Sequence, residues 1–275
     1  YVTVALNGDG GDELFGGYNR YLHGAPLIRR TRRLPALVRG PTASLLERLA
    51  AYAGSEHVLG RLRPASAGSQ HSQGERLRKI ARVLRAGDEL GAYEALLDVG
   101  LSEVGNGHES LDEWPSEAWG PLEARMMLLD QGHYLPDDLL AKVDRASMWE
   151  SLEARVPILD HHVVELSWRF PDDYKIRDGV TKWPLRRIAA HYLPDRLLDR
   201  PKMGFMVPMD GWLRSGLREW ARDATQDSAR LSAVLDPALQ SQLWAKFEAG
   251  RADLALPLWA LTVLGAWSRC HGVEF

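Results

Sequence analysis

The sequence predicts an α/β fold that is mostly α-helical and carries one or a few strands of a parallel sheet. Three features support this prediction: a short strand opens the chain, an acidic glycine-rich turn follows it directly, and most later segments show helical spacing of apolar residues. With 275 residues, 45% of them hydrophobic, the chain is long enough for one large domain, or for one domain with a subdomain.

The opening strand covers residues 1–6, where valine, threonine and tyrosine dominate. Residues that are β-branched or aromatic favour extended structure. Because the strand begins at once and without an initiating methionine, we expect the chain to be a fragment whose parallel sheet lies mostly upstream.

The turn after this strand brings carboxylates and glycines together in the sequence NGDGGDELFGGY, residues 7–18. In open α/β sheets, ligands bind where the strands end. Glycines there let the backbone approach a ligand, and carboxylates suit Mg²⁺, an ammonium group or ammonia that must lose a proton. A Walker-type loop is excluded because it carries Lys and Ser/Thr, and an acidic surface turn that caps a helix is the alternative. The candidate residues are Gly8, Asp9, Gly10, Gly11, Asp12 and Glu13.

Helices are expected in most of the remaining chain. Asp12 is expected to cap a helix that runs to Tyr21, and Asp160 is expected to cap another helix. Pro136 is expected to begin a helix with Asp137 and Asp138 in its first turn, where they are candidates for a substrate or metal contact. Residues 64–74 predict a flexible linker. Further helices are expected over residues 42–52 and 75–84, from Thr181 onward, and as a buried closing helix at 251–269 that is apolar on nearly every side.

Lys182 follows Thr181 at the start of a predicted helix, in the sequence TKWPLRR. The helix dipole is positive at that end, so an ammonium group there is electrostatically unfavourable by itself. An anion such as pyrophosphate, held by the lysine and the helix amides together, explains the position. An ordinary exposed lysine is the alternative.

Several other polar residues are weaker candidates. Lys202 lies in a loop with a glycine and flanking prolines, from which it could reach a phosphate. His161 and His162 are adjacent and are expected to point to different sides of a helix, so they predict no metal site. A semi-buried ion network between two helices is the interpretation of the charges at Asp144, Arg145, Glu153 and Arg155.

Composition excludes several function classes. The net charge of −3 gives no electrostatic footprint for nucleic acid or an anionic membrane, and no apolar run is long enough to span a bilayer. An arginine-rich stretch, residues 29–39, is interpreted as a solvated helix face or a contact with missing parts of the protein, and a nucleic-acid patch is the less favoured alternative. Cys270 is the only cysteine, which excludes an internal disulfide and is typical of a reducing, cytoplasmic setting.

Five segments together resemble the synthetase domain of glutamine-dependent asparagine synthetases. They are NGDGGDELFGGY, YLPDDLLAKVDRASM followed by EARVPILD, TKWPLR, RPKMGFMVPMDGWLR and LPLWALTVLGAW, in the family's order and over most of the chain. The resemblance implies an adenine-nucleotide alpha-hydrolase-like fold, with residues 1–275 as the carboxyl-terminal part of the synthetase domain.

The resemblance also implies a reaction. Mg-ATP adenylates the side-chain carboxylate of aspartate, pyrophosphate leaves, and ammonia derived from glutamine attacks the acyl-adenylate. Asp9 falls where the family places an acid beside this intermediate, although several relatives have Glu there. Lys182 falls on the lysine that neutralises the leaving pyrophosphate. Asp12 and Glu13 match the acidic pair that follows, and Asp12 is expected to contact Mg²⁺ through ATP.

Two family features are missing from the sequence: the Ser-Gly-Gly-x-Asp-Ser pyrophosphate loop and a glutaminase domain with an N-terminal cysteine. The resemblance thus implies a cytoplasmic ligase that is incomplete by itself, with small-molecule substrates, a missing glutaminase domain and a homodimer as a possible assembly. Two alternatives stay open: an amidotransferase acting on another carboxylate, such as a surface-sugar acid, and a catalytically silent truncated remnant.

Overall fold

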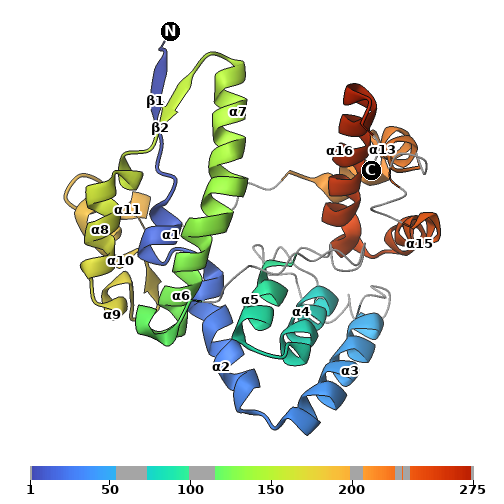
Figure 1. Ribbon diagram of the computed structural model, residues 1–275, viewed down its shortest axis with the longest axis horizontal. Coiled ribbons are helices and arrows are strands. Elements are labelled where there is room, and N and C mark those ends of the chain that lie inside the picture. Colours follow the sequence, from blue (N-terminus) through green and yellow to red (C-terminus); the bar gives the residue numbers. More distant parts are fainter. Residues whose placement is uncertain are drawn as a thin grey trace. The chain divides into compact units, whose positions relative to one another are not determined.

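The computed structural model describes residues 2–53, 73–98, 115–198, 207–226, 231 and 236–273. Lys202 and residues 64–72 of the predicted linker lie outside these ranges, whereas Gln73 and Gly74 begin a helix. The chain divides into two compact units (Figure 1). Unit 1 contains residues 1–33 and 111–202, and unit 2 contains residues 34–110 and 203–275. In the described parts of the chain, every helix is too short or too polar to cross a membrane.

Unit 1 contains a small parallel sheet and a hairpin among helices (Figure 1). Its strands are β1 Val4–Leu6, β2 Glu153–Arg155, β3 Ile176–Arg177 and β4 Val180–Thr181. Its α-helices are α1 Gly11–Phe15, α2 Ala25–Arg33, α6 Leu122–Leu129, α7 Ala141–Trp149, α8 His161–Arg169, α9 Asp172–Lys175, α10 Trp183–Ala189 and α11 Asp195–Leu198. Segments of π-helix cover Arg20–Gly24 and Asp130–Leu140, and short 3₁₀ turns cover Glu117–Trp119 and Pro157–Leu159.

The two sheets place the segments that follow them. β1 pairs in parallel with β2, with Val4 opposite Glu153 and Leu6 opposite Arg155. The strand predicted at the start of the chain is thus confirmed over Val4–Leu6. β3 and β4 form a tight antiparallel hairpin whose two turn residues, Asp178 and Gly179, both have positive φ. The hairpin returns the chain directly into α10.

The helix after the glycine-rich turn is shorter than predicted. Gly10, with φ of 81°, is its N-cap, and no side chain caps it, so the expected role of Asp12 as a cap is wrong. The helix ends at Gly16, with φ of 68°, instead of running to Tyr21. A Cβ at Gly16 would lie 2.7 Å from Cγ1 of Ile176. The positive φ and the close approach of the β3 hairpin both require glycine there.

Two other helix starts also differ from prediction. Pro136 lies inside a continuous helix from α6 to α7, in the π-helical part, where a wider turn accommodates the missing N–H. Asp137 and Asp138 are therefore in mid-helix. Lys182, not Thr181, is the N-cap of α10, because Thr181 ends strand β4.

Unit 2 is helical over its described residues. Its helices are α3 Ala36–Ala53, α4 Gln73–Arg85, α5 Glu89–Leu97, α12 Met209–Arg214, α13 Arg218–Thr225, α15 Pro237–Glu248 and α16 Ala255–His271, with a 3₁₀ turn at Ala252–Leu254. One hydrophobic cluster includes Leu213, Leu243, Phe247, Leu258 and Leu261. The predicted closing helix forms as α16, but it is buried on only one face: Leu256, Val263 and Trp267 are 44–47% exposed. Helices α3 and α4 confirm the helices expected over 42–52 and 75–84.

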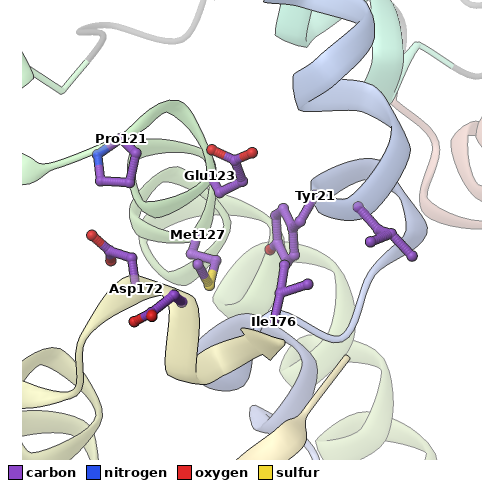
Figure 2. Close-up of a pocket in the computed structure, with 8 residues that line it drawn as sticks. Tyr21, Pro121, Glu123, Met127, Asp172 and Ile176 are labelled. Carbon is purple, nitrogen blue, oxygen red and sulfur yellow. The ribbon is translucent and has the colours of Figure 1, made fainter. Parts of the chain in front are cut away.

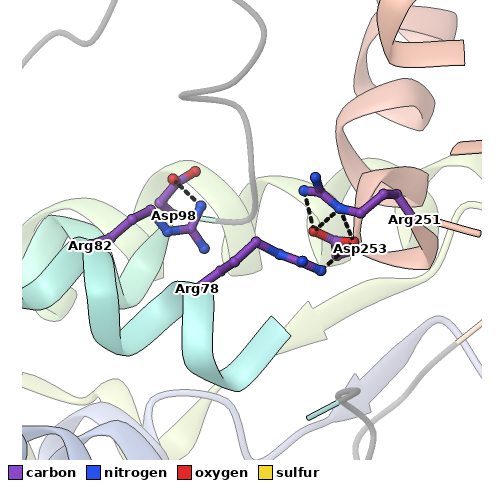
Figure 3. A network of polar contacts seen from close by, with 5 residues as sticks. All are labelled: Arg78, Arg82, Asp98, Arg251 and Asp253. Carbon is purple, nitrogen blue, oxygen red and sulfur yellow. Dashed lines mark hydrogen bonds and ion pairs between the residues drawn. The ribbon is translucent and has the colours of Figure 1, made fainter. Parts of the chain in front are cut away.

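An ion-pair network joins the two sequence segments that make up unit 2 (Figure 3). Asp253, just before α16, accepts hydrogen bonds from Arg251 (Nη2 to Oδ2, 2.7 Å) and from Arg78 on α4 (Nη2 to Oδ1, 3.0 Å). Burial raises the pKa of the Asp253 carboxyl, but the hydrogen bond from Arg251 and the charges of both arginines outweigh burial, so the net pKa lies below its ordinary value. Charge-assisted bonds of this kind hold α4 to the start of α16.

The network predicts a pH dependence of stability. Because the folded-state pKa of Asp253 is depressed, its contribution is present above the ordinary carboxyl pKa of about 3.9 and is lost as the pH falls through the folded-state value. Asp253→Asn should lower the free energy of unfolding by about 1–3 kcal/mol near pH 7. Urea unfolding at pH 3–7 would measure this difference between the two proteins, which should narrow below about pH 4. A constant difference across that range contradicts the assignment.

The contact between α13 and α16 gives a second prediction. A Cβ at Gly265 would lie 2.1 Å from the carbonyl oxygen of Ala224, a backbone atom that cannot rotate away. Gly265→Ala should destabilise the protein by about 2 kcal/mol through overpacking. Gly211→Ala is the matched control, because nothing lies within 4 Å of its Cβ position. Thermal unfolding followed by circular dichroism should show a drop for Gly265→Ala only, and equal melting temperatures would refute the close contact.

Candidate active site

The turn after β1 is built around the position of Gly10. Its positive φ of 81° disfavours any side chain, and a Cβ there would also lie 2.3 Å from Cδ2 of Leu159 and displace that side chain. Asp9 is partly exposed, and its backbone N–H donates to Oδ1 of Asn7 at 3.1 Å. Around Gly8, by contrast, nothing lies within 4 Å of an added Cβ. Of the three glycines in this turn, Gly8 is therefore the one beside which the backbone is open to a ligand.

Lys182 contacts Asp12 across the site. Its Nζ lies 3.0 Å from Oδ2 of Asp12, and the two side chains are 31% and 25% exposed. The backbone N–H of Lys182 donates to the carbonyl of Phe15 at 3.2 Å, which ties the start of α10 to the end of α1. The structure thus brings together two of the residues predicted from separate motifs. The Asp12 carboxylate supplies the anion that the position of Lys182 requires.

The backbone of Lys182 is unusual. Its φ of 54° and ψ of 36° place it in the left-handed region, which a residue with a side chain adopts at a cost. The carbonyl of Lys182 accepts from the N–H of Arg186 at 2.9 Å, so the strained residue is held from both sides. Pro184 is at the second position of the helix and has no N–H. One of the helix amides that were predicted to bind an anion is therefore absent. The ammonium group of Lys182 is the main positive charge that this helix start offers to an anion.

Glu13 is fully buried, unlike its neighbour Asp12. Its Oε1 accepts from the Tyr18 hydroxyl at 2.5 Å, and its backbone carbonyl accepts from Gln131 Nε2 at 3.1 Å. Burial raises the pKa of Glu13, and the charge of Asp12 adds to the rise, although the Tyr18 bond opposes it. The Glu13 side chain thus points into unit 1 and supports the turn from within.

A cluster of aromatic and charged residues beside Glu13 was not predicted from the sequence. The Arg20 guanidinium lies 3.8 Å from the Tyr18 ring centroid and 4.8 Å from that of Tyr134. Buried Asp130 accepts from Arg20 (Nη2 to Oδ2, 2.7 Å) and from the Tyr21 hydroxyl. In the sequence, the one feature that pointed toward this cluster is Tyr18, which ends the motif FGGY. The partners Asp130 and Tyr134 are more than 100 residues away along the chain, so no local pattern links them to it.

The remaining predicted residues lie elsewhere or outside the described ranges. Asp137 is exposed, and Asp138 pairs with Lys142 one turn along the same helix at 2.8 Å. Burial raises the pKa of the Tyr134 hydroxyl above its ordinary value, and the nearby charge of Asp138 raises it further. Tyr134 also packs edge-on against Tyr18, so aromatic rings connect this helix to the turn. Lys202 is not among the described residues.

Two interpretations of polar clusters are wrong. Glu153 and Arg155 lie on strand β2, are exposed and pair with each other, whereas Asp144 and Arg145 are exposed on α7, so they form no buried network between helices. His161 and His162 do not point apart, because their ring centroids are 3.8 Å from each other.

The two histidines and Asp160 form an exposed group whose ligand atoms all lie within 4.8 Å of one another. They sit at the start of α8, where Asp160 accepts from the N–H of His162 at 2.9 Å and so acts as the predicted cap. The dipole is positive at this end of a helix, which disfavours a bound cation. The group is therefore explained by capping of α8.

A hollow of about 230 Å³ lies in unit 1 (Figure 2). The side chains of Tyr21, Met127 and Ile176 and the carboxylates of Glu123 and Asp172 surround it. None of the predicted site residues lines it. The carboxylate of Glu123 is already paired with Arg29 through two hydrogen bonds, of 2.7 and 2.8 Å. Arg29 belongs to the arginine-rich stretch at residues 29–39, and its pairing with Glu123 is a contact within unit 1.

The site at the turn fits Mg²⁺ and a phosphate-bearing ligand by the chemistry of its donors. Asp12 offers a partly exposed carboxylate, the hard oxygen ligand that Mg²⁺ prefers, while Lys182 offers a cation to an anionic group. Mg²⁺ commonly uses one or two protein carboxylates, with phosphate oxygens and water as its other ligands. Glu13 is unsuited to this role because its carboxyl is buried against Tyr18.

Comparison with known proteins gives one consistent result. The family model for asparagine synthase matches residues 1–269. The chain is 29% identical over 270 residues to glutamine-hydrolyzing asparagine synthetase 1 of Bacillus subtilis, and 32% identical over 282 residues to putative glutamine-hydrolyzing asparagine synthetases of Mycobacterium bovis and Mycobacterium tuberculosis.

These alignments cover 97% of this chain but only 39–40% of the length of the relatives. No solved structure matches the chain significantly. The family match extends over almost the whole chain and includes the turn after β1, the helix that follows it, and Lys182. The chain therefore belongs to the asparagine synthase family.

Proposed function

We propose that this chain carries part of the active site for ATP-dependent amide formation on a carboxylate, through an acyl-adenylate. The proposed substrate is aspartate, the product asparagine, and the nitrogen source ammonia derived from glutamine. The contact of Lys182 with Asp12 beside the turn after β1 carries this proposal, because it sets a cation and a carboxylate together at the end of a strand. Family membership supports the choice of reaction.

Each residue of the site has a proposed role. Lys182 neutralises the charge that builds on pyrophosphate as it leaves, and Asp12 holds Mg²⁺ that arrives with ATP. Asp9 lies beside the acyl-adenylate, close to the open backbone at Gly8. Gly10 and Gly11 shape the turn, and Glu13 supports it from inside the unit.

The more distant candidates stay proposals of lesser weight. Asp137 and Asp138 are proposed to contact substrate from the helix that reaches the turn through Tyr134 and Tyr18. Lys202 is proposed to reach a phosphate. At the level of the whole protein, we propose a glutaminase domain, in line with the glutamine-hydrolyzing names of the relatives. We also propose a cytoplasmic location and a homodimer.

A second candidate substrate rests on one observation, the shorter Asp9 where several family members have Glu. A shorter acid leaves more room beside the adenylate and favours a larger carboxylate, such as a sugar acid. Pyrophosphate release from ATP in the presence of aspartate or of a uronic acid, measured on the full-length gene product, separates the two substrates. Release with neither, together with no binding of Mg-ATP by calorimetry, supports a silent remnant.

Lys182→Ala should lower the rate of ammonia-dependent, ATP-driven amide formation by about two to three powers of ten, because a charge that stabilises the leaving group is lost. The measurement is pyrophosphate release by the full-length gene product with ammonia as the nitrogen source. Lys246→Ala, on the exposed face of α15, is the control and should keep the parent rate. An unchanged rate for Lys182→Ala rejects the role of this lysine.

Asp12→Asn should change pyrophosphate affinity in opposite directions with and without Mg²⁺. Without metal, Asp12 repels the anion and competes for Lys182, so its neutralisation should tighten binding by about two- to fivefold, the range of a partly exposed ion pair. With Mg²⁺ present, the variant loses a metal ligand and should bind pyrophosphate more weakly. Calorimetry in EDTA and in Mg²⁺ would measure both effects, with the exposed Asp144→Asn as control. Tighter binding under both conditions contradicts a role for Asp12 in holding the metal.

A further inference from the structure

The side chains of Asp12 and Lys182 form their ion pair directly beside the backbone of Gly17. Gly17 is buried, and a Cβ built on it would lie 2.0 Å from Oδ1 of Asp12 and 2.3 Å from Cε of Lys182. Real Cβ atoms do not approach other heavy atoms this closely. Both side chains therefore occupy the space that any other residue at position 17 would fill.

Backbone hydrogen bonds fix the three residues relative to one another. The N–H of Gly17 donates to the carbonyl of Asp12 at 2.8 Å, closing the end of α1. The N–H of Lys182 donates to the carbonyl of Phe15 at 3.2 Å. Both backbones are thus tied to α1, and the two side chains form their ion pair directly beside Gly17.

The reason for glycine at position 17 differs from the reason at its neighbour Gly16. Gly16 has a positive φ of 68°, so a side chain there is strained whatever the space. Gly17 is not among the residues with positive φ, so its backbone accepts alanine without strain. The atoms that an alanine methyl would meet belong to flexible side chains, not to backbone. Alanine at position 17 therefore allows the fold and displaces only the ion pair.

We propose that Gly17 is a positioning residue of this site, whose missing side chain is the space in which Lys182 is aligned with Asp12. It acts through Lys182 and touches no substrate itself. The inference rests on the proposed function for its catalytic consequence, but the effect on the ion pair stands independently of the reaction.

The first test measures the ion pair without any reaction. Labelling of lysines in the full-length gene product with acetic anhydride, read by mass spectrometry, reports how accessible and reactive each lysine amino group is, because only the unprotonated amine attacks the anhydride. Gly17→Ala should raise the labelling rate of Lys182 several-fold relative to the exposed reference Lys246, because Lys182 loses its carboxylate partner. Gly132→Ala is the matched control, since Gly132 is exposed and nothing lies within 4 Å of its Cβ position. Unchanged labelling of Lys182 in Gly17→Ala overturns the inference.

The second test measures the consequence for the reaction. Gly17→Ala should lower kcat at least tenfold while its melting temperature stays within about 2 °C of the parent, a shift that corresponds to a small change in stability. In a Lys182→Ala background, adding Gly17→Ala should lower the rate by no more than about twofold, because both changes remove the same interaction. A melting temperature lowered by many degrees, or a full effect in the Lys182→Ala background, assigns Gly17 a structural role and overturns the inference.

The two proposals fail separately. If Lys182→Ala abolishes amide formation and Gly17→Ala leaves it unchanged, the positioning role is wrong and the proposed function stands. If Lys182→Ala leaves amide formation unchanged while Gly17→Ala still exposes Lys182 to labelling, the ion-pair geometry is right and the catalytic role of Lys182 is wrong.

Discussion

The contact between Asp12 and Lys182 is the interaction on which the rest of the site depends. It joins the turn after β1 to the start of α10, two segments that are far apart in the sequence. Each partner is in an unfavourable setting without the other. Lys182 stands at the positive end of a helix in a left-handed conformation, and Asp12 is one of three acids in a short turn. Their pairing offsets both costs while leaving each side chain partly open to solvent.

The contrast between Asp12 and Glu13 shows how two adjacent acids acquire different roles. Glu13 is buried against Tyr18 and has a raised pKa, so its side chain belongs to the interior of unit 1. Asp12, one residue earlier, is partly exposed to solvent and pairs with the ammonium group of Lys182. The helix α1 makes this separation possible, since successive residues of a helix point in directions about 100° apart. The acidic pair therefore divides into one structural and one exposed carboxyl.

Support for the turn comes from a layer of residues behind it. Arg20, held by Asp130, lies over the rings of Tyr18 and Tyr134, and Tyr18 in turn bonds Glu13. These contacts couple the π-helical segments at Arg20–Gly24 and Asp130–Leu140 to the turn. Such widened helical turns often mark functional sites. In this protein two buried carboxyl groups each bond a tyrosine hydroxyl, Glu13 that of Tyr18 and Asp130 that of Tyr21.

The sequence by itself determined the local features whose causes are local. The strand at Val4–Leu6, the cap at Asp160, the helices around residues 42–52 and 75–84, and the family of the chain all follow from residue types and their order. It also identified Asp12 and Lys182 as candidates for the same site, without indicating that their side chains form an ion pair.

Only the tertiary structure decided where helices end and which side chains meet. Gly16 ends α1 in a left-handed conformation, and Ile176 of a distant hairpin occupies the space that a side chain there would need. Pro136 stays inside a helix because a π-helical turn accommodates it. Gly17 is glycine because two side chains from different segments cross above it. Contacts between residues distant in the chain depend on packing of whole elements, so local residue preferences could not reveal them.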